Sequence, residues 1–242
     1  MQATSLHKAV FAHRGASAHA PENTLAAFRL AQQSRADGIE FDIHLTKDQQ
    51  IVVIHDEDVA RTTNGQGKVQ NLTLEEIRRL DAGQGEKVPT LTEVLDMIGD
   101  QMYINIELKG FGGAAARLPE KCVTLVKAHQ LGSKVIYSSF NPPLLIRIRR
   151  HAPEAKLGLL MLAGQSGTVV RLIFSPWVRP WSLHPDYSSV TQSFLQRANH
   201  QGLGVITWTV NHPEEMLRLF SIGIQGIITD DPVQAIEVRS AT

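Results

Sequence analysis

The chain has 242 residues, of which 43% are hydrophobic and 20% are charged, a composition that is ordinary for a globular protein with one large core. Basic and acidic residues both number 24, so the formal net charge is zero. Zero net charge argues against binding to nucleic acid through bulk positive charge, although a small anionic substrate needs only local cations. We therefore expect no nucleic-acid partner.

Cysteine content and hydropathy bear on where the protein works. The single cysteine, Cys122, excludes an internal disulfide and lies in an amphipathic helical pattern, where a free cysteine is usually buried. No stretch reaches the roughly 18 apolar residues of a membrane span, and residues 1–8 lack the apolar centre of a signal peptide. We expect no membrane partner and a cytoplasmic location, although a secreted chain already freed of its signal peptide would look the same. The sequence indicates no oligomeric state.

Apolar strand-like runs alternate with helical patterns along most of the chain. The predicted strands are residues 10–13, 39–45, 103–108, 135–140, 157–161, 181–184, 205–210 and 227–229. The predicted helices are residues 22–35, 74–80, 90–98, 114–129, 143–151, 192–201 and 213–220. Pro21 and Glu22 suit the start of the first helix, and Thr90 and Glu93 have the spacing of a capping box. Residues 162–179 fit no ordinary link between strand and helix.

Eight strands alternating with helices, in a chain close to the typical length of about 250 residues, predict a (β/α)8 TIM barrel. A doubly wound open sheet alternates in the same way and is the alternative fold. However, the residues from Gly15 to Ala18 lack the GxGxxG pattern that marks dinucleotide-binding sheets. We expect one barrel domain over residues 1–242, with a small insertion at residues 46–88 after the second strand.

Five residues separate the second strand from a further apolar run at residues 51–55. This gap is too short for a crossover helix, so the two runs are predicted to form a β-hairpin. With its turn centred between Asp48 and Gln49, Asp42 and His55 become cross-strand partners. The hairpin therefore brings His55 close to the acids of the second strand.

Acidic residues interrupt two apolar strands, at Glu40 and Asp42 in the second strand and at Glu107 in the third. Alternate strand residues point the same way, and the apolar faces should meet the helices, so these acids should point into the barrel. Burying three carboxylates is costly unless they are compensated, and a carboxylate-rich set without thiolates suits one divalent cation, Mg²⁺ or Ca²⁺. The alternative is a set of structural ion pairs with Arg14 and Lys109.

Two histidines, His13 and His55, end apolar runs close to these acids. Histidine has a pKa near ~6.5 and suits proton transfer at neutral pH, although metal ligands or core histidines are open alternatives. Arg14 and Lys109 are natural phosphate ligands, one as a fork and the other as a point charge. A metal ion, two cationic side chains and two histidines fit the cleavage of a phosphodiester.

From about residue 10 to residue 235, the chain resembles the glycerophosphodiester phosphodiesterase family. The resemblance is carried by an ordered series of motifs: His13-Arg14-Gly15, Pro21-Glu22-Asn23-Thr24, Glu40-Phe41-Asp42, Leu45-Thr46-Lys47-Asp48, His55-Asp56, Arg61-Thr62-Thr63-Asn64-Gly65, Asn105-Ile106-Glu107-Leu108-Lys109, Trp208-Thr209-Val210-Asn211 and Thr229-Asp230-Asp231-Pro232. His-Arg-Gly alone would be weak, whereas the ordered series is specific. The resemblance implies a TIM barrel with a small insertion after the second strand.

The resemblance also implies a reaction of glycerol and lipid metabolism. The small-molecule substrate would be a glycerophosphodiester, such as glycerophosphocholine or glycerophosphoethanolamine, and the products glycerol 3-phosphate and an alcohol. The roles that it implies are a general acid and base at His13 and His55, metal ligands at Glu40, Asp42 and Glu107, and phosphate contacts at Arg14 and Lys109.

Four further residues are candidate substrate contacts, each with a structural alternative. Asn23 could orient His13 or the metal ligands, or cap a helix. Trp208 and Phe140 could line the substrate pocket, or pack in the core. His184 could touch substrate at the end of its strand, or be purely structural.

Two other functions fit parts of the pattern. A metal-independent glycosidase would use Glu40 and Glu107 as paired carboxylates and would not need His13 or Arg14. A non-catalytic phosphate-binding barrel would keep its cations and tolerate the loss of both histidines. The sequence leaves open the preferred head group, the histidine that acts as base, and whether a cyclic phosphate forms.

Overall fold

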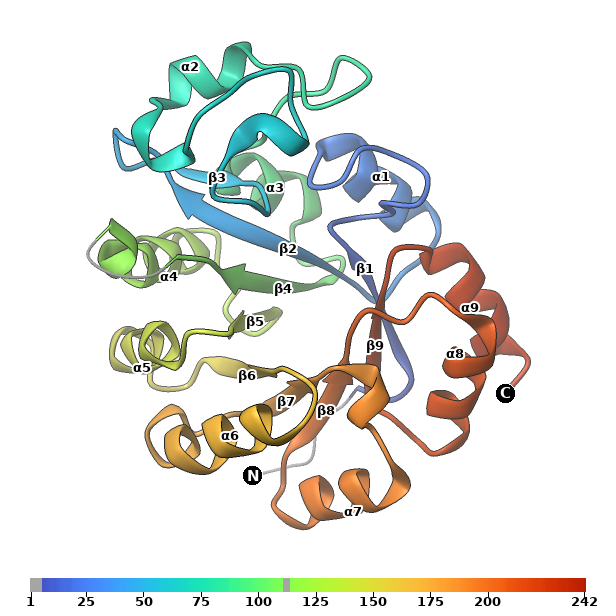
Figure 1. Ribbon diagram of the computed structural model, residues 1–242. Coiled ribbons are helices and arrows are strands. Elements are labelled where there is room, and N and C mark those ends of the chain that lie inside the picture. Colours follow the sequence, from blue (N-terminus) through green and yellow to red (C-terminus); the bar gives the residue numbers. More distant parts are fainter. Residues whose placement is uncertain (1–5, 111–113) are drawn as a thin grey trace.

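The computed structural model describes residues 6–110 and 114–242, so the first five residues of the N-terminal segment considered above lie outside it. Strand β1 (Ala9–His13) pairs in parallel with both β2 (Gly38–Leu45) and β9 (Gly226–Thr229), which closes the sheet (Figure 1). The other barrel strands are β4 (Tyr103–Leu108), β5 (Val135–Ser139), β6 (Lys156–Met161), β7 (Ser182–Pro185) and β8 (Gly204–Thr207). Closure confirms the TIM barrel and excludes the open, doubly wound sheet.

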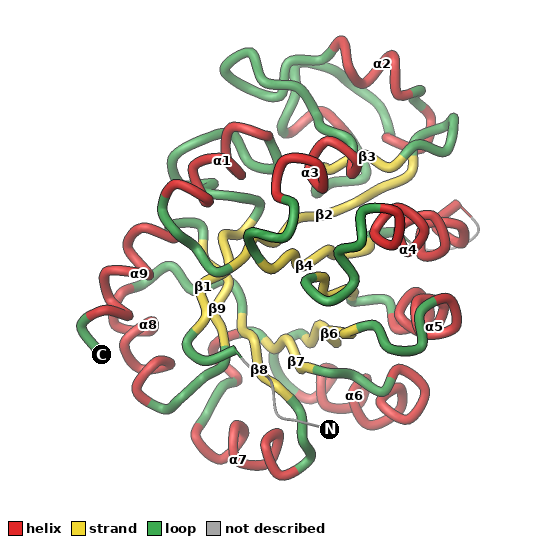
Figure 2. Tube along the Cα trace, turned by 180° about the vertical axis from the view of Figure 1, so that it is seen from behind, coloured by secondary structure: helices red, strands yellow, loops and turns green. Residues whose placement is uncertain are grey.

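Helices form a ring outside the strands, as both Figure 1 and Figure 2 show. They are α1 (Leu25–Gln33), α3 (Leu91–Ile98), α4 (Leu118–Ala128), α5 (Pro142–His151), α6 (Gln165–Val178), α7 (Gln192–His200), α8 (Pro213–Ser221) and α9 (Pro232–Ser240). The predicted capping box is present, because Thr90 accepts from the Glu93 N–H while the Glu93 carboxylate accepts from the Thr90 N–H. Helix α6 occupies residues that had no predicted element, and α9 was also not predicted. No helix within the described ranges is long and apolar enough to cross a membrane.

The start predicted for the first helix was wrong by three residues. Asn23 has a left-handed backbone (φ 57°), and Thr24 is the N-cap, with its hydroxyl accepting a hydrogen bond from the Ala27 N–H. The helix therefore begins at Leu25. Glu22 stays in the preceding loop, where its carboxylate is available to the active-site region.

Alternation along the strands separates the two sides of the barrel wall. Ile39, Phe41 and Ile43 of β2 belong to the large core shared with the helices, as do the outward residues of β4. A smaller cluster that includes Phe11, Ile136, Ile206 and Ile228 packs together with Trp181 and Trp208. The predicted outward faces of these two strands are confirmed. The polar residues of β2 and β4 occupy the opposite face, toward the carboxyl ends of the strands. TIM barrels carry their active sites at these ends.

Between β2 and α3 the chain forms a small unit of its own. It contains β3 (Ile51–Val53), α2 (Leu74–Arg79) and two short 3-10 helices, at Val59–Arg61 and Val69–Asn71. Its apolar residues form a separate cluster, made of Val52, Ile54, Val59, Val69, Ile77, Ala82 and Val88. Figure 1 shows this unit beside β2 and α1.

The hairpin is present, but its predicted register was wrong by one residue. Strand β3 pairs antiparallel to β2 with Ile43 opposite Val53, and the Ile54 N–H donates to the Asp42 carbonyl at 3.0 Å. Asp42 therefore faces Ile54 rather than His55. The Thr46 N–H donates to the Gln50 carbonyl, which leaves an odd number of residues in the turn. One of these residues, Gln49, adopts a left-handed φ of 62°.

Candidate active site

Three buried acids converge at the carboxyl end of the barrel. Glu40 and Asp42 lie on β2, and Glu107 lies on β4, in register with Asp42. One ligand oxygen from each of the three lies within 4.8 Å of those of the other two. The parallel pairing of neighbouring strands thus creates the predicted cluster, and the three residues are 7% exposed at most.

Two cations compensate part of this negative charge. Lys109 Nζ lies 3.1 Å from Asp42 Oδ1 and 2.6 Å from Glu107 Oε1. Arg14 Nε lies 3.5 Å from Asp42 Oδ2, and the backbone N–H of Arg14 donates to Glu40 Oε2 at 3.3 Å. The pair of cations therefore brackets Asp42, and three carboxylates face two cationic side chains.

The pKa values of the acids reflect this arrangement. Burial raises the pKa of Glu40 well above its usual range, and the charges of Asp42 and Glu107 add to the rise. Burial and the charge of Asp42 raise the pKa of Glu107 to about 7. Burial also opposes ionisation of Asp42, but the charges of Lys109, His55 and Arg14 outweigh it and lower the pKa to about 2. The two cationic side chains are therefore not enough to keep all three acids ionised at neutral pH, and a further positive charge would be needed to do so.

These residues fit a divalent cation. The donor set consists of carboxylate oxygens, which Mg²⁺ and Ca²⁺ prefer, and a dication would favour ionisation of all three acids. Asn23 adds an oxygen nearby: its amide nitrogen donates to Asp42 Oδ2 at 3.2 Å, while its buried Oδ1 has no hydrogen-bond partner among the described residues. The cluster can therefore hold one metal ion.

Each candidate catalytic histidine is held by a carboxylate. His13 Nδ1 lies 2.6 Å from Asp230 Oδ1, and its Nε2 lies 3.9 Å from Glu40 Oε2. His55 Nδ1 lies 2.5 Å from Asp56 Oδ1. A carboxylate at Nδ1 fixes the tautomer and leaves Nε2 for proton transfer. Both imidazoles therefore have the partner that an acid/base residue needs.

The backbone of His55 is also held, by a second histidine. His44 Nε2 donates to the His55 carbonyl at 3.0 Å, and burial lowers the pKa of His44, so the neutral ring is favoured. His44 lies on β2, one inward position beyond Asp42, so the strand that carries two acids also anchors His55.

Ion pairs connect the two ends of the site. Arg61 contacts Asp56 (Nε to Oδ2, 2.6 Å) and Glu22 (Nη1 to Oε2, 2.8 Å). Glu22 Oε1 in turn accepts from Arg14 Nη1 at 2.8 Å. Hydrogen bonds from Arg61 lower the pKa of Asp56 below its usual range. The chain of contacts runs from His55 through the small unit after β2 to the phosphate-binding candidate Arg14.

A cavity of about 120 Å³ lies in front of these groups. Its lining consists of His13, Arg14, Glu40, His55, Asn105, Glu107, Lys109, Ser138, Phe140, Leu160, Trp208, Thr209 and Ile228. Phe140 and Trp208 meet edge to face with ring centroids 5.3 Å apart, and Trp208 Nε1 donates to the His184 carbonyl at 2.8 Å. Trp208 was predicted to lie within a strand, but it follows the end of β8. Its peptide bond to Thr209 is cis.

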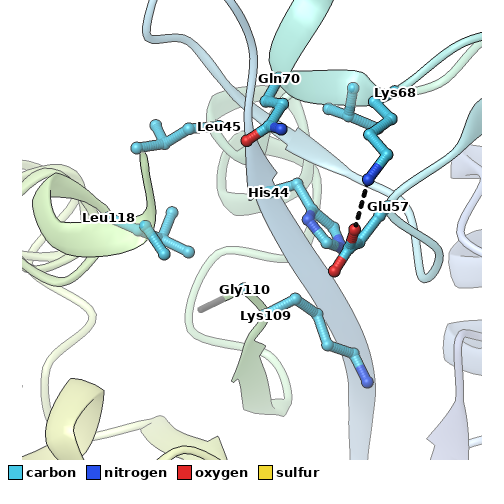
Figure 3. A pocket seen from close by; sticks show the side chains of 10 residues that line it. His44, Leu45, Glu57, Lys68, Gln70, Lys109, Gly110 and Leu118 are labelled. Atoms are coloured by element: carbon cyan, nitrogen blue, oxygen red, sulfur yellow. Dashed lines mark hydrogen bonds and ion pairs between the residues drawn. The ribbon is translucent and has the colours of Figure 1, made fainter. Parts of the chain in front are cut away.

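A second cavity of about 140 Å³ shares Lys109 with the lining of the first. It is lined by polar and apolar side chains that include His44, Glu57, Lys68 and Leu118. Figure 3 shows the Lys109 ammonium pointing away from the ion pair between Glu57 and Lys68, whose Oε2 and Nζ are 3.4 Å apart. Lys109 thus lines both cavities.

Two predicted substrate contacts line neither cavity. His184 is fully buried, its Nε2 is 2.8 Å from Ser182 Oγ, and it lines neither cavity. Gly158 makes room for its ring, since a Cβ there would lie 2.5 Å from His184 Cε1. Asn23 also lines neither cavity and contacts Asp42 instead. The structure brings the other nine candidate residues together around the first cavity.

Sequence reasoning gave no role to several residues around the site. Asp230 follows β9 and so lies at the carboxyl end of a barrel strand, the same signal that identified His13. Asn105 shares the inward face of β4 with Glu107, and Ser138 lies in register with Glu107 on β5. The Asn105 Oδ1 and Ser138 Oγ atoms are buried and have no hydrogen-bond partner in the described part of the chain. Strand position was thus a usable signal for all three.

Imidazoles held by carboxylates, together with fixed cationic side chains at the mouth of an α/β barrel, are typical of a hydrolase that acts on phosphate esters. Comparison with known proteins narrows this class. Residues 13–234 match the glycerophosphoryl diester phosphodiesterase family. The chain belongs to this family, and it is an enzyme.

The relatives and solved structures agree with the family assignment. The chain is 42% identical over 236 residues to a glycerophosphodiester phosphodiesterase of Caldanaerobacter subterraneus. The alignment covers 92% of this chain and 94% of the relative. A phosphodiesterase of Oleispira antarctica, solved in complex with the product sn-glycerol-3-phosphate, superposes with a TM-score of 0.89 at 30% identity and 97% coverage of both chains. A putative glycerophosphoryl diester phosphodiesterase of Silicibacter pomeroyi gives a TM-score of 0.90 at 28% identity, covering 99% of this chain and 95% of the other.

Proposed function

We propose that this enzyme hydrolyses glycerophosphodiesters such as glycerophosphocholine and glycerophosphoethanolamine to glycerol 3-phosphate and an alcohol. The observation that carries the proposal is the meeting of two carboxylate-held imidazoles, Arg14, Lys109 and the acid cluster around one cavity. The product complex of the Oleispira relative supports the nature of the product. Family membership decides against both the glycosidase and the non-catalytic barrel considered from the sequence.

We propose that Glu40, Asp42 and Glu107 bind one divalent cation, Mg²⁺ or Ca²⁺. Bound there, the ion would stabilise negative charge on the phosphoryl oxygens. Arg14 and Lys109 line the same cavity and contribute fixed positive charge to those oxygens. Both cations already lie within 3.5 Å of Asp42 and are therefore held in place before substrate arrives.

His13 and His55 divide the proton transfers. One imidazole takes the proton of the attacking hydroxyl as the new O–P bond forms, and the other donates a proton to the departing alkoxide as the old P–O bond breaks. The nucleophile is either water or the glycerol 2-hydroxyl, which would first give a cyclic phosphate that water then opens. Detection of a cyclic glycerophosphate during turnover of a slow variant supports the second route.

The two cavities offer room for the two ends of the diester. With the phosphate at Lys109, we place the glycerol against Phe140 and Trp208 and the alcohol beside Glu57 and Lys68. Lys68→Gln should then change the ratio of KM values for glycerophosphocholine and glycerophosphoglycerol. An unchanged ratio would refute this orientation.

A coupled assay tests the function. Purified protein is given glycerophosphocholine, and a dehydrogenase reports glycerol 3-phosphate, with and without EDTA. We expect product release that EDTA abolishes and that added Mg²⁺ or Ca²⁺ restores. Activity that survives EDTA would remove the metal from the proposal. The cytoplasmic location expected from the sequence stays a prediction that cell fractionation can check.

A further inference from the structure

One side of the barrel exposes an apolar stripe, which we define as Leu162, Val169, Leu172, Ile173 and Trp177. Each of these side chains is at least 50% exposed, and Leu172 and Trp177 exceed 60%. Within the described chain only two other large apolar side chains, Leu217 and Val233, are comparably exposed. Leu172, Ile173 and Trp177 lie three, four and eight positions after Val169, so the helical members of the stripe share one face of α6. Such a concentration of exposed apolar groups marks an interaction site.

A groove continues the stripe toward α7. It has a volume of about 580 Å³ and is lined by Arg171, Leu172, Pro176, Arg179, Trp181 and Leu203, among others. Arg171 Nη1 donates to Gln201 Oε1 at 3.3 Å, which joins the two helices across the groove. Guanidinium groups and apolar side chains therefore alternate on this surface, so a partner must satisfy both.

The same side of the barrel is basic although the whole protein is neutral. Helices α5, α6 and α7 contain no Asp or Glu, and Figures 1 and 2 show them side by side. Residues 142–203 include seven Lys and Arg residues against two acids, Glu154 and Asp186. That leaves 17 of the 24 basic residues and 22 of the 24 acidic residues for the rest of the chain. The charge is thus separated between two sides of the molecule.

We propose that this face, made of the apolar stripe and the arginines of α5 to α7, docks on the surface of a lipid bilayer that contains anionic lipids. Such a surface offers an apolar layer for Leu172 and Trp177 and negative charge for the surrounding arginines. A second copy of the chain fits less well, because a two-fold interface would bring two basic faces together. The exposed apolar side chains and the positive charge of this face therefore both fit an anionic lipid bilayer.

Docking of this kind leaves the active site accessible. Leu162 directly follows β6, so the stripe begins at the rim of the barrel mouth and then runs along α6 down the outer wall. The mouth itself faces water, and a soluble substrate can still enter. The expectation of no membrane partner came from the lack of a spanning segment, which peripheral docking does not require.

Flotation with vesicles tests the proposal without relying on catalysis. The full chain is mixed with vesicles of phosphatidylcholine and phosphatidylglycerol, or of phosphatidylcholine alone. We expect binding to the mixed vesicles that weakens at high salt and is much lower on neutral vesicles. The combined change of Leu172→Gln and Trp177→Gln should lower the partition coefficient by about tenfold or more. The matched control is Leu217→Gln on α8, 49% exposed in the wild type, which should bind as the wild type does.

A second pair of variants tests the charge. Arg171→Gln with Arg197→Gln should weaken binding to the mixed vesicles severalfold, whereas Arg29→Gln on the exposed side of α1 should not. None of these residues lines the cavity that contains His13 and His55, so the variants should still hydrolyse soluble substrate. Failure of that hydrolysis in every protein, wild type included, would count against the proposed function alone.

Three results would overturn the docking proposal. The first is a wild type that does not float with the mixed vesicles. The second is equal flotation of the wild type and the double variant at Leu172 and Trp177. The third is a wild-type dimer that the same double variant converts to a monomer in sedimentation, without vesicle binding, because the stripe would then serve a second copy.

Discussion

His13 Nδ1 and Asp230 Oδ1 lie 2.6 Å apart although 217 positions separate the two residues in the sequence. The contact exists because β1 and β9 are neighbours in the closed barrel, so the carboxyl ends of the first and last strands meet. Asn211 and Ser17 also donate hydrogen bonds to Asp230. Together with the contact to His13, these hydrogen bonds outweigh the effect of burial and lower the pKa of Asp230 below its usual range. Asp230 is therefore an ionised anchor for His13.

Asp230→Asn tests that anchor. Loss of the carboxylate should lower kcat by about 10- to 100-fold with little change in KM, because Asp230 orients His13 and does not line the catalytic cavity. Steady-state kinetics on glycerophosphocholine measures both parameters. The matched control is Asp231→Asn, in which the new amide can still cap α9. Equal losses in the two variants would contradict the assignment.

The two histidines themselves should be needed for turnover. His13→Ala and His55→Ala should each lower kcat by about 10²- to 10⁴-fold while the circular dichroism spectrum stays unchanged. His200→Ala, at the exposed end of α7, serves as the control. If either active-site variant keeps nearly full activity, that histidine has no acid/base role.

Arg61 should influence turnover more than stability. It holds Asp56 and Glu22, which contact His55 and Arg14, yet its own side chain is 47% exposed. Exposed ion pairs contribute little to folding, so Arg61→Gln should change the free energy of unfolding by less than about 1 kcal/mol. The kcat value should nevertheless fall roughly tenfold, as expected for a group that positions catalytic residues. Arg79→Gln on α2 is the control, and a similar kcat for both variants would remove this role.

His184 should make the fold sensitive to acid. Burial lowers its pKa to about 3 from an ordinary value of 6.5, so the folded protein keeps it neutral while the unfolded chain binds a proton. The unfolded state is therefore favoured as pH falls from 6.5 toward 3, by up to about 1.4 kcal/mol for each pH unit.

Urea unfolding of the wild type and of His184→Gln between pH 7 and pH 4.5 measures this effect. The difference between the two proteins isolates His184 from the acids with raised pKa values, whose effect has the opposite sign. We expect a shallower loss of stability with falling pH in the variant. Parallel curves would show that His184 does not titrate as described.

The separation of strand faces explains why much of the site was predictable. Glu40, Asp42 and Glu107 alternate with large apolar residues, and that alternation alone fixes the direction of their side chains. Their mutual proximity then follows from the parallel pairing of β2 and β4. Most helices and strands carried equally clear periodic patterns.

The features that were not predicted depend on contacts distant in sequence or on details of turns. Asp230 gains its meaning only from barrel closure, and the place of His184 depends on Gly158 of the neighbouring strand. The hairpin register depended on the left-handed Gln49 in the turn. Helix α6 contains Gly167, Ser175 and Pro176, and it carries apolar residues both on its exposed face and on the side that packs against the core, so no alternation of apolar and polar residues marked it as a barrel helix.

Metal binding by the acid cluster is the central claim, and calorimetric titration of Mg²⁺ or Ca²⁺ into metal-free protein tests it directly. We predict one ion per chain for the wild type and an affinity lower by about 10- to 100-fold for Glu107→Gln. Glu120→Gln, on the exposed side of α4, should match the wild type. A wild type that binds no ion, or a Glu107→Gln variant with unchanged affinity and stoichiometry, would contradict the account.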